Sequence, residues 1–332
     1  MKIGIVVCNN GYGHIRRQSI IAAELIYRRH NVVMYAPIHS LKNMGSDLVN
    51  YCRDFNTHTC ASDWMQGNSS KWLKSIGSMC EYDAVISDNL IDILSVRPDA
   101  IISGSFFWHK TLDLPMHVIE NQEKLLTEHE PTIISNKYFS PDYIRSRKNF
   151  VPIGFIEKGI VARRYKQRHK NKSVLLTIGM GRSDSETLMK HYIIDVVEGR
   201  SFNFRQFDKI YIESRMFNNS LPPNFVRAKF DEPMFEDLDV VIGRPGMGII
   251  TECATRNIDY ISILESSNSE MTFNNNVLTH HFNTVVVGDF EEGLDFACSG
   301  QFKETLLSKA NTAGLSEFVS IVEGKHEFVA QS

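Results

Sequence analysis

The chain has 332 residues, of which 42% are hydrophobic and 23% are charged. This composition is ordinary for a globular protein, and the length suits two domains of about 150 residues each better than one. The formal net charge of −3 excludes the strongly basic overall surface that attracts nucleic acid or an anionic membrane.

The opening segment and the cysteines favour a cytoplasmic protein. The first apolar run, in MKIGIVVCNN, spans about six residues before it reaches polar residues and glycine, which is too short for a signal peptide core. No later apolar run reaches the roughly 18 residues of a membrane span. The six cysteines are scattered without a CxxC pair, so we expect reduced thiols and no zinc site.

Strand-like and helix-like segments alternate through the first half of the chain. The patterns predict strands over residues 3–8, 32–35, 84–87, 100–103, 132–135 and 150–152, and helices over 15–29 and 112–128. This alternation indicates a parallel sheet with crossover helices in a domain of residues 1–157.

The second half repeats the pattern. Expected strands cover residues 174–178, 210–213, 240–242, 260–263 and 284–287, and expected helices cover 186–197, 249–255, 274–281 and a stretch from about residue 302. We therefore predict a second α/β domain over residues 173–332.

Residues 158–172 separate the two halves and carry seven Lys or Arg and no acid. The ordinary interpretation is a solvated linker between domains. The alternative is a basic patch that contacts phosphate groups or a membrane surface.

A glycine turn follows the first predicted strand, in NNGYGH at residues 9–14. Gly11 and Gly13 let the backbone approach a ligand closely, and the helix that begins there offers N–H groups suited to phosphate. His14 lies at this edge and could act as a general base, although a lone histidine is often structural. Arg16 and Arg17 in the first turn oppose the helix dipole, so we expect an anion nearby.

A second glycine turn connects a predicted strand to a helix in IGRPGMGIITE at residues 242–252. Its glycines and helix terminus suit a diphosphate. The carboxylate of Glu252 could accept hydrogen bonds from both hydroxyls of a ribose, unless it is simply a surface acid near a helix start. The expected contacts of this turn are Arg244, Gly246, Met247, Gly248, Thr251 and Glu252.

Two further segments of the second half carry candidate ligands. The strand over 174–178 ends in GMGRS, where backbone donors and an arginine could meet phosphate, or a serine could cap the next helix. Acid and amide side chains near the start of a later helix could bind sugar hydroxyls, although asparagines there are also good caps. These candidates are Gly179, Gly181, Arg182, Ser183, Glu270, Asn274 and Asn276.

Polar and aromatic residues follow two strands of the first half, in SDN at 87–89 and GSFFWH at 104–109. Asp88 and His109 could orient a hydroxyl and are further catalytic candidates, while aromatic faces commonly support sugars. We therefore predict Asn89, Phe107 and Trp108 on the acceptor side, with burial in the core as the alternative for Phe106 and Phe107.

The sequence DLD at 237–239 matches a metal-diphosphate motif of a different fold. It precedes its predicted strand instead of following one. We interpret it as a strand edge, and we expect neither a metal nor a resident cofactor.

The two glycine turns resemble a known group. GYGHIRRQSIIAAEL looks like the opening of the UDP-sugar hydrolase of pseudaminic acid synthesis, with its pattern GxGHxxR. IGRPGMGIITECA resembles the nucleotide-binding signature shared with the N-acetylglucosaminyltransferase that forms lipid II. The resemblance implies a GT-B fold, in which an acceptor-side and a nucleotide-sugar-binding Rossmann-like domain face each other across a cleft. Thr272 or Phe273 stands where the family usually has glutamine, and the transferase's longer amino-terminal glycine loop is absent.

These observations together predict a glycosyltransferase with a nucleotide-sugar donor, expected to be UDP-linked. Its acceptor is a sugar, a lipid-linked compound or a small molecule, and nucleic acid is not a partner. In the alternative, water takes the place of the acceptor and the protein is a nucleotide-sugar hydrolase, which the GYGHIRR match favours. A nucleotide-sugar sensor without turnover is the third interpretation.

Overall fold

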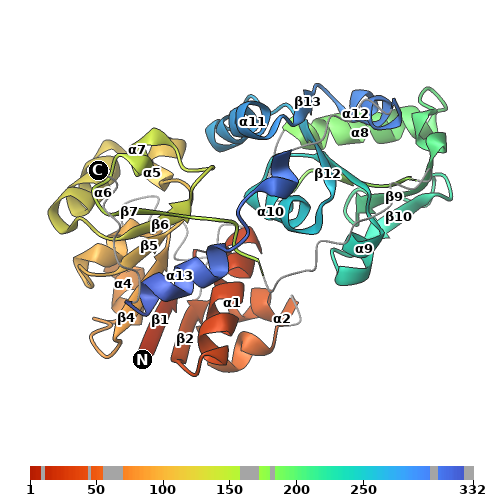
Figure 1. Ribbon diagram of the computed structural model, residues 1–332. Helices are drawn as coiled ribbons and strands as arrows, with labels where there is room; N and C mark the ends of the chain where they lie inside the picture. Colours follow the sequence, from red (N-terminus) through yellow and green to blue (C-terminus); the bar gives the residue numbers. More distant parts are fainter. Residues whose placement is uncertain are drawn as a thin grey trace. The chain divides into compact units, whose positions relative to one another are not determined.

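The computed structural model describes residues 1–8, 12–43, 46–54, 70–157, 172–179, 184–299 and 306–324. The chain divides into two units, one of Met1–Lys158 with Asn311–Ser332 and one of Gly159–Ala310 (Figure 1). Each unit holds one parallel sheet flanked by helices. The predicted basic segment 158–172 lies outside the described residues, except for its last residue, which begins a strand.

The first unit is built on a seven-stranded sheet of order β3-β2-β1-β4-β5-β6-β7, in which all neighbours are parallel. The central strands β1, β4 and β5 therefore deliver their carboxyl ends to one edge, where ligands bind in sheets of this kind. The strands are β1 (Lys2–Val6), β2 (Asn31–Ala36), β3 (Cys52–Asp54), β4 (Ala84–Asp88), β5 (Ile101–Ser103), β6 (Ile133–Asn136) and β7 (Phe150–Ile153).

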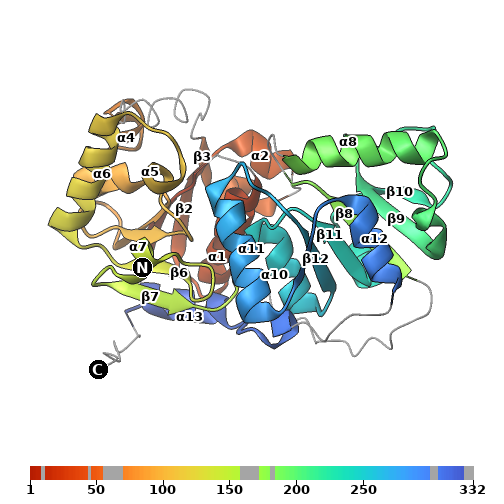
Figure 2. The same ribbon diagram turned by 90° about the horizontal axis from the view of Figure 1, so that it is seen from above.

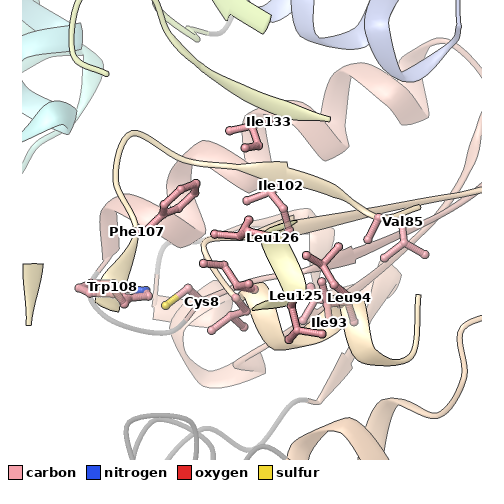
Figure 3. Close-up of a cluster of buried hydrophobic side chains, with 14 of the residues drawn as sticks. Cys8, Val85, Ile93, Leu94, Ile102, Phe107, Trp108, Leu125, Leu126 and Ile133 are labelled. Carbon is pink, nitrogen blue, oxygen red and sulfur yellow. The ribbon is translucent and has the colours of Figure 1, made fainter. Parts of the chain in front are cut away.

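Side chains of β1 and the residues after it alternate between two cores, as expected for a strand buried on both faces. Ile3 and Ile5 pack into one cluster, whereas Val6 and Cys8 pack into another, part of which Figure 3 shows. The helices of this unit are α1 (Tyr12–Tyr27), α2 (Ile38–Asn43), α4 (Ser70–Ile76), α5 (Trp108–Thr111), α6 (Met116–His129), α7 (Asp142–Arg145) and α13 (Gly314–Val322), with 3₁₀ turns η1 (Asp47–Tyr51) and η2 (Ile91–Ser95).

The last helix of the described chain, α13, belongs to the first unit, which corrects the predicted domain of residues 173–332. Phe318 and Val319 are fully buried in the same cluster as Ile3 and Ile5. At the end of the helix, Glu323 accepts hydrogen bonds from Arg28, at 3.2 Å, and from His30, at 2.9 Å. The helical stretch expected from residue 302 is therefore two separate elements, the 3₁₀ turn η4 (Leu306–Lys309) and the helix α13, and only η4 belongs to the second unit.

The second unit has a six-stranded parallel sheet of order β10-β9-β8-β11-β12-β13. Its strands are β8 (Lys172–Thr177), β9 (Phe207–Glu213), β10 (Phe225–Ala228), β11 (Val240–Gly243), β12 (Asp259–Ile263) and β13 (Val285–Val287). Its helices are α8 (Asp184–Val197), α9 (Glu232–Asp237), α10 (Met247–Arg256), α11 (Ser269–Phe282) and α12 (Phe290–Cys298), with η3 (Asn203–Gln206) and η4 (Leu306–Lys309).

Helices α8 and α12 contact each other and pack on the sheet of the second unit (Figure 2). Met189 of α8 and Phe290 of α12 are fully buried in one cluster with Val174 and Leu176 of β8. Within the described part of the chain, no helix is both long and apolar enough to cross a membrane.

Candidate functional site

A histidine and an aspartate meet at the carboxyl edge of the first sheet. His14 lies in the first turn of α1, which follows β1, and Asp88 is the last residue of the neighbouring strand β4. The Nδ1 atom of His14 lies 2.9 Å from Oδ2 of Asp88. The same oxygen accepts the backbone N–H of Cys8 at 3.3 Å, and Arg17 donates to the other carboxylate oxygen. The fold thus joins two of the predicted catalytic residues.

The Asp88 carboxylate is fully buried but well compensated. Burial alone would raise its pKa, but the charges of His14 and Arg17 and their hydrogen bonds outweigh that effect and lower the pKa below its ordinary value. Asp88 is therefore ionised near neutral pH and can hold a protonated imidazole.

Nε2 of His14 is the ring nitrogen that does not contact Asp88. Because Nδ1 contacts the carboxylate, the tautomer that donates from Nδ1 leaves a lone pair on Nε2. The ring is bordered by Trp108, with centroids 5.7 Å apart, and by Phe106, at 6.3 Å. An imidazole held by a carboxylate and bordered by aromatic rings is suited to take a proton from a hydroxyl group or water.

The two arginines at the start of α1, Arg16 and Arg17, form ion pairs with carboxylates of the protein. Arg17 pairs with Asp88, and Arg16 lies 3.6 Å from the buried carboxylate of Glu157, just after β7. Glu157 accounts for the anion that the sequence predicts beside Arg16, so a bound phosphate is not required there. Gly13 is exposed, with open space where a Cβ would lie, and Gly11 is outside the described residues.

Asn89 is a buried structural residue, which corrects its predicted place on the acceptor side. Its backbone is left-handed, with φ of 56°, and its side chain lies against Gly104, where a Cβ would come within 1.4 Å of Asn89 Oδ1. With the amide oriented to donate, its nitrogen lies 3.0 Å from Ser103 O and 3.2 Å from Phe106 O. The Asn89 side chain thus stabilises the turn between β5 and Trp108 through these two hydrogen bonds.

Phe107 and His109 face the interior, which is the alternative given for Phe107 but differs from the prediction for His109. Phe107 is 1% exposed and stacks on the His109 ring at 5.6 Å. Both nitrogens of His109 have protein partners, Gln122 at 3.0 Å and Glu123 at 2.8 Å, and burial lowers the pKa of the ring despite the pull of Glu123. His109 therefore links α5 to α6, and its ring nitrogens contact Gln122 and Glu123 and not Asp88, the carboxylate that binds His14. Trp108, at 7% exposure, belongs to the same core, part of which Figure 3 shows, but borders His14.

In the second unit, a buried carboxylate organises the turn after β8. Oε1 of Glu213, the last residue of β9, accepts the backbone N–H of Ile178 at 2.8 Å and of Gly179 at 2.9 Å, and the hydroxyl of Thr177 at 2.7 Å. Gly179 has φ of 63°, which glycine adopts without strain. Its N–H is therefore already used within the protein. The other candidates of this turn, Gly181, Arg182 and Ser183, lie outside the described residues.

A second buried carboxylate caps the helix that follows. Glu265, just after β12, is 0% exposed and accepts the backbone N–H of Ser185 at 3.1 Å and of Asp184 at 3.3 Å. The Ser185 hydroxyl also donates to it. These are first-turn donors of α8, which the sequence would offer to a phosphate.

Arg244 joins the two glycine turns of this unit. It follows β11, its backbone N–H donates to Thr177 O at 3.2 Å, and its Nε lies 3.8 Å from the Glu265 carboxylate. Its side chain also lies beside Gly179. Helix α10 then begins at Met247 with Gly246 as its N-cap, and both Gly246 and Gly248 have open space where a Cβ would lie. The fold thus places a cation and a helix terminus together, as a diphosphate requires.

Glu252 does not reach solvent in this structure. It is 0% exposed, and its Oε2 accepts from Nε of Arg256 at 2.5 Å. Arg256 in turn pairs with both oxygens of Glu232 on α9. Thr251, the residue before Glu252, donates a hydrogen bond from its hydroxyl to the backbone oxygen of Met247 at 2.7 Å. Because its side chain is fully buried, Glu252 can bind a ribose only if it becomes exposed.

The asparagines of α11 divide between structure and surface. Asn274 is buried, and its Nδ2 donates to Pro245 O at 2.8 Å, which ties α11 to the loop before α10. Asn276 is exposed, and Glu270 is half-buried in the first turn. Asn274 therefore supports the turn that carries Gly246 and does not present its amide to solvent.

The DLD segment lies at the amino-terminal edge of its sheet, away from the glycine turns. Asp237 binds Tyr211 at 2.7 Å and Lys209 at 3.1 Å, and Asp239 accepts the backbone N–H of Ser173 at 3.0 Å. Among the described residues, no group of three or more His, Cys, Asp or Glu side chains comes together as a metal site would require.

Sequence reasoning missed three buried acids, and a local signal was present for two of them. Glu213 ends the apolar run IYIE, and Glu265 follows YISIL. An acid directly after a buried parallel strand sits at the ligand-binding edge, where burial requires partners. Glu157 carried no such signal, because its strand is short and includes a proline.

No family model and no curated protein matches the chain. Its fold, however, is similar to solved structures over nearly the whole length. The calicheamicin glycosyltransferase CalG4 has a TM-score of 0.62 at 12% identity, covering 99% of each chain. Arabidopsis thaliana UGT89C1 in complex with UDP has a TM-score of 0.60 at 11% identity, covering 98% of this chain and 95% of that one. MurG of Acinetobacter baumannii has a TM-score of 0.58 at 12% identity, covering 97% of this chain and 99% of that one.

These similarities and the two parallel sheets define the fold as GT-B, with one Rossmann-like sheet in each unit. This confirms the fold that the two glycine turns predict. At 11–12% identity the likeness concerns architecture alone.

Proposed function

We propose that the protein is a metal-independent glycosyltransferase that uses a UDP-linked sugar as donor. The observation that carries the proposal is the pairing of His14 with the buried carboxylate of Asp88 at the carboxyl edge of β1 and β4. A general base at this position can remove the proton from an acceptor hydroxyl and so make its oxygen a nucleophile. The name of one similar structure, the calicheamicin glycosyltransferase CalG4, and the UDP bound to another, UGT89C1, support the same class.

In the proposed reaction, Nε2 of His14 accepts the proton of the acceptor hydroxyl as its oxygen attacks the anomeric carbon of the donor. The bond from that carbon to the diphosphate breaks, and the nucleoside diphosphate leaves with the bonding electrons. Asp88 stabilises the imidazolium that forms. Arg244 and the amino terminus of α10 meet the charge that develops on the departing diphosphate. Glu252 turns toward the ribose, and the exposed Asn276 and the half-buried Glu270 are proposed sugar contacts.

The test is to measure nucleotide release from UDP-sugars in the presence of candidate acceptors. Replacing His14 with Ala should lower turnover at least about 100-fold, because general-base catalysis contributes that much. UDP affinity, measured by calorimetry, should stay unchanged because His14 is not in the nucleotide-binding unit. A His14→Ala variant with wild-type turnover would refute the assignment.

A hydrolase is the second candidate, favoured by the GYGHIRR segment. The same base would then activate water, and the products would be free sugar and UDP. Incubation with UDP-sugars alone separates the two functions. Prompt release indicates the hydrolase, whereas slow release that an acceptor accelerates indicates the transferase.

We also place the reaction in the cytoplasm. In the described part of the chain, Cys8, Cys52, Cys80, Cys253 and Cys298 are thiols and not disulfides. Reduced cysteines are usual in that compartment.

A further inference from the structure

Arg17 shares the Asp88 carboxylate with His14. The two residues are three apart on α1 and so lie on one face of the helix. Nη2 of Arg17 binds Oδ1 of Asp88, whereas Nδ1 of His14 and the Cys8 N–H bind Oδ2. Each oxygen of one buried carboxylate therefore has a cationic or potentially cationic partner.

The charged groups that act most strongly on the Asp88 carboxylate are His14 and Arg17. From β1 comes Cys8, with its backbone N–H on the carboxylate. From the turn after β5 and from α5 come the uncharged rings of Phe106 and Trp108, which border His14. The neighbouring Arg16 is directed to Glu157 instead. The electrostatic balance at Asp88 is thus set by His14 and Arg17.

The charge on Arg17 does not change with pH, because guanidinium remains protonated. A buried carboxylate whose only charged partner is a histidine would strongly favour the imidazolium, since nothing else compensates its charge. Arg17 supplies that compensation permanently. The imidazole can then lose its proton and accept another one in the next turnover, while Asp88 stays ionised and in place.

We propose that Arg17 is a positioning residue that sets the proton affinity of His14 through their shared carboxylate. This inference rests on the proposed function, because it assigns a consequence for turnover to the base named there. It gives the arginine of the GxGHxxR pattern a physical role in catalysis without contact to the substrate.

The test is the pH dependence of kcat/KM for Arg17→Gln. Loss of the guanidinium leaves the Asp88 charge opposed by His14 alone, so the imidazolium is stabilised. The acidic limb of the profile should then move to higher pH by about 1 unit, within the range produced by one close charge. Arg17→Lys, which keeps the charge, should return the limb toward its wild-type position. Arg28→Gln, which removes an ion-paired arginine just beyond the other end of α1, serves as control and should leave the limb unmoved.

A second readout does not require activity. NMR titration of the His14 ring should show the same upward movement of its midpoint in Arg17→Gln, and Arg17→Met, which keeps the apolar stem, replaces that variant if it does not fold. A purely structural role would lower activity with no movement of the midpoint, and that result would overturn the inference. If His14→Ala retained wild-type turnover, the proposed function itself would fail, whereas an inactive His14→Ala with an unmoved midpoint in Arg17→Gln would refute only the role of Arg17.

Discussion

Glu265 caps the helix that begins beside Ser185, with 3.1 Å between its carboxylate and the Ser185 backbone nitrogen. The acid comes from the end of β12 and the helix from the turn after β8, two strands that are not neighbours in the sheet. A protein carboxylate therefore occupies donors that a diphosphate would otherwise use. Among the described residues of this unit, Arg244 and the amino terminus of α10 are the groups that we expect to meet the charge of a nucleotide.

Replacing Glu265 with Gln should lower the free energy of unfolding by about 1.5–3 kcal/mol, the range for hydrogen bonds to a charged group. The loss arises because Gln offers one neutral acceptor to the N–H groups of Asp184 and Ser185. Urea unfolding measures the change. Glu128→Gln, at an exposed pair with Lys124, is the matched control and should stay within about 0.5 kcal/mol.

Removing Arg256 should destabilise the second unit by about 3–5 kcal/mol, because it leaves Glu252 as a buried charge without this partner. The double variant Glu252→Gln with Arg256→Gln should lose much less than the sum of the single changes. Urea unfolding of the four proteins of this cycle measures the coupling. Strict additivity would show that the ion pair carries no energy of its own.

The nucleotide assignment predicts that Arg244→Gln weakens UDP binding about 10- to 100-fold, as expected for loss of a charge-assisted contact of about 1.5–3 kcal/mol. Glu252→Ala should weaken it by a similar factor if its carboxylate turns toward the ribose. Isothermal calorimetry with UDP gives both values. Unchanged affinity in Arg244→Gln would remove this arginine from the site.

The cluster of Glu123 with Arg147, Lys110 and His109 should make the stability of the protein depend on pH. Burial opposes ionisation, but Arg147, Lys110 and His109 bind the carboxylate and lower its pKa from 4.5 to about 2. A lowered pKa gives stability that is complete above 4.5 and is lost as the pH falls through about 2. The difference in unfolding free energy between wild type and Glu123→Gln should therefore be largest near neutrality and shrink in that acidic window. A difference that stays constant from pH 7 to 2 would contradict it.

Phe318→Ala tests the attachment of α13 to the first unit. The ring is fully buried, so its loss should cost about 3–5 kcal/mol. Thermal or urea unfolding measures the change. The exposed Phe202, on the second unit, is the control, and Phe202→Ala should have little effect.

The repeated strands and glycine turns were predictable because they depend on local pattern. Apolar runs such as IGIVV and the glycines after them mark buried parallel strands and their exits, and both sheets contain the strands predicted this way. The short edge strands β3 and β10 were not predicted, since three or four residues are too few to show an apolar run or an alternating pattern.

The site was only partly predictable, because burial of a polar side chain depends on contacts distant in sequence. Asp88 and His14 were expected from their positions at strand exits, and the fold joins them. His109 has the same kind of position, yet Gln122 and Glu123 of α6 occupy both its nitrogens. The sequence around residue 109 carries no pattern that predicts these partners. The same holds for Glu252, whose Arg256 is linked onward to α9.

Because α13 completes the core around Ile3 and Ile5, the first unit is discontinuous in the chain. During synthesis on a ribosome, the strands of the first unit emerge early, but α13, which covers their core, emerges much later. Every residue of the second unit emerges before α13. We therefore expect the first unit to complete its core only after α13 has been synthesised. A fragment that stops after β7 would leave the apolar surface under α13 open to solvent, so expression of that half alone should yield aggregation unless residues 311–324 are joined to it.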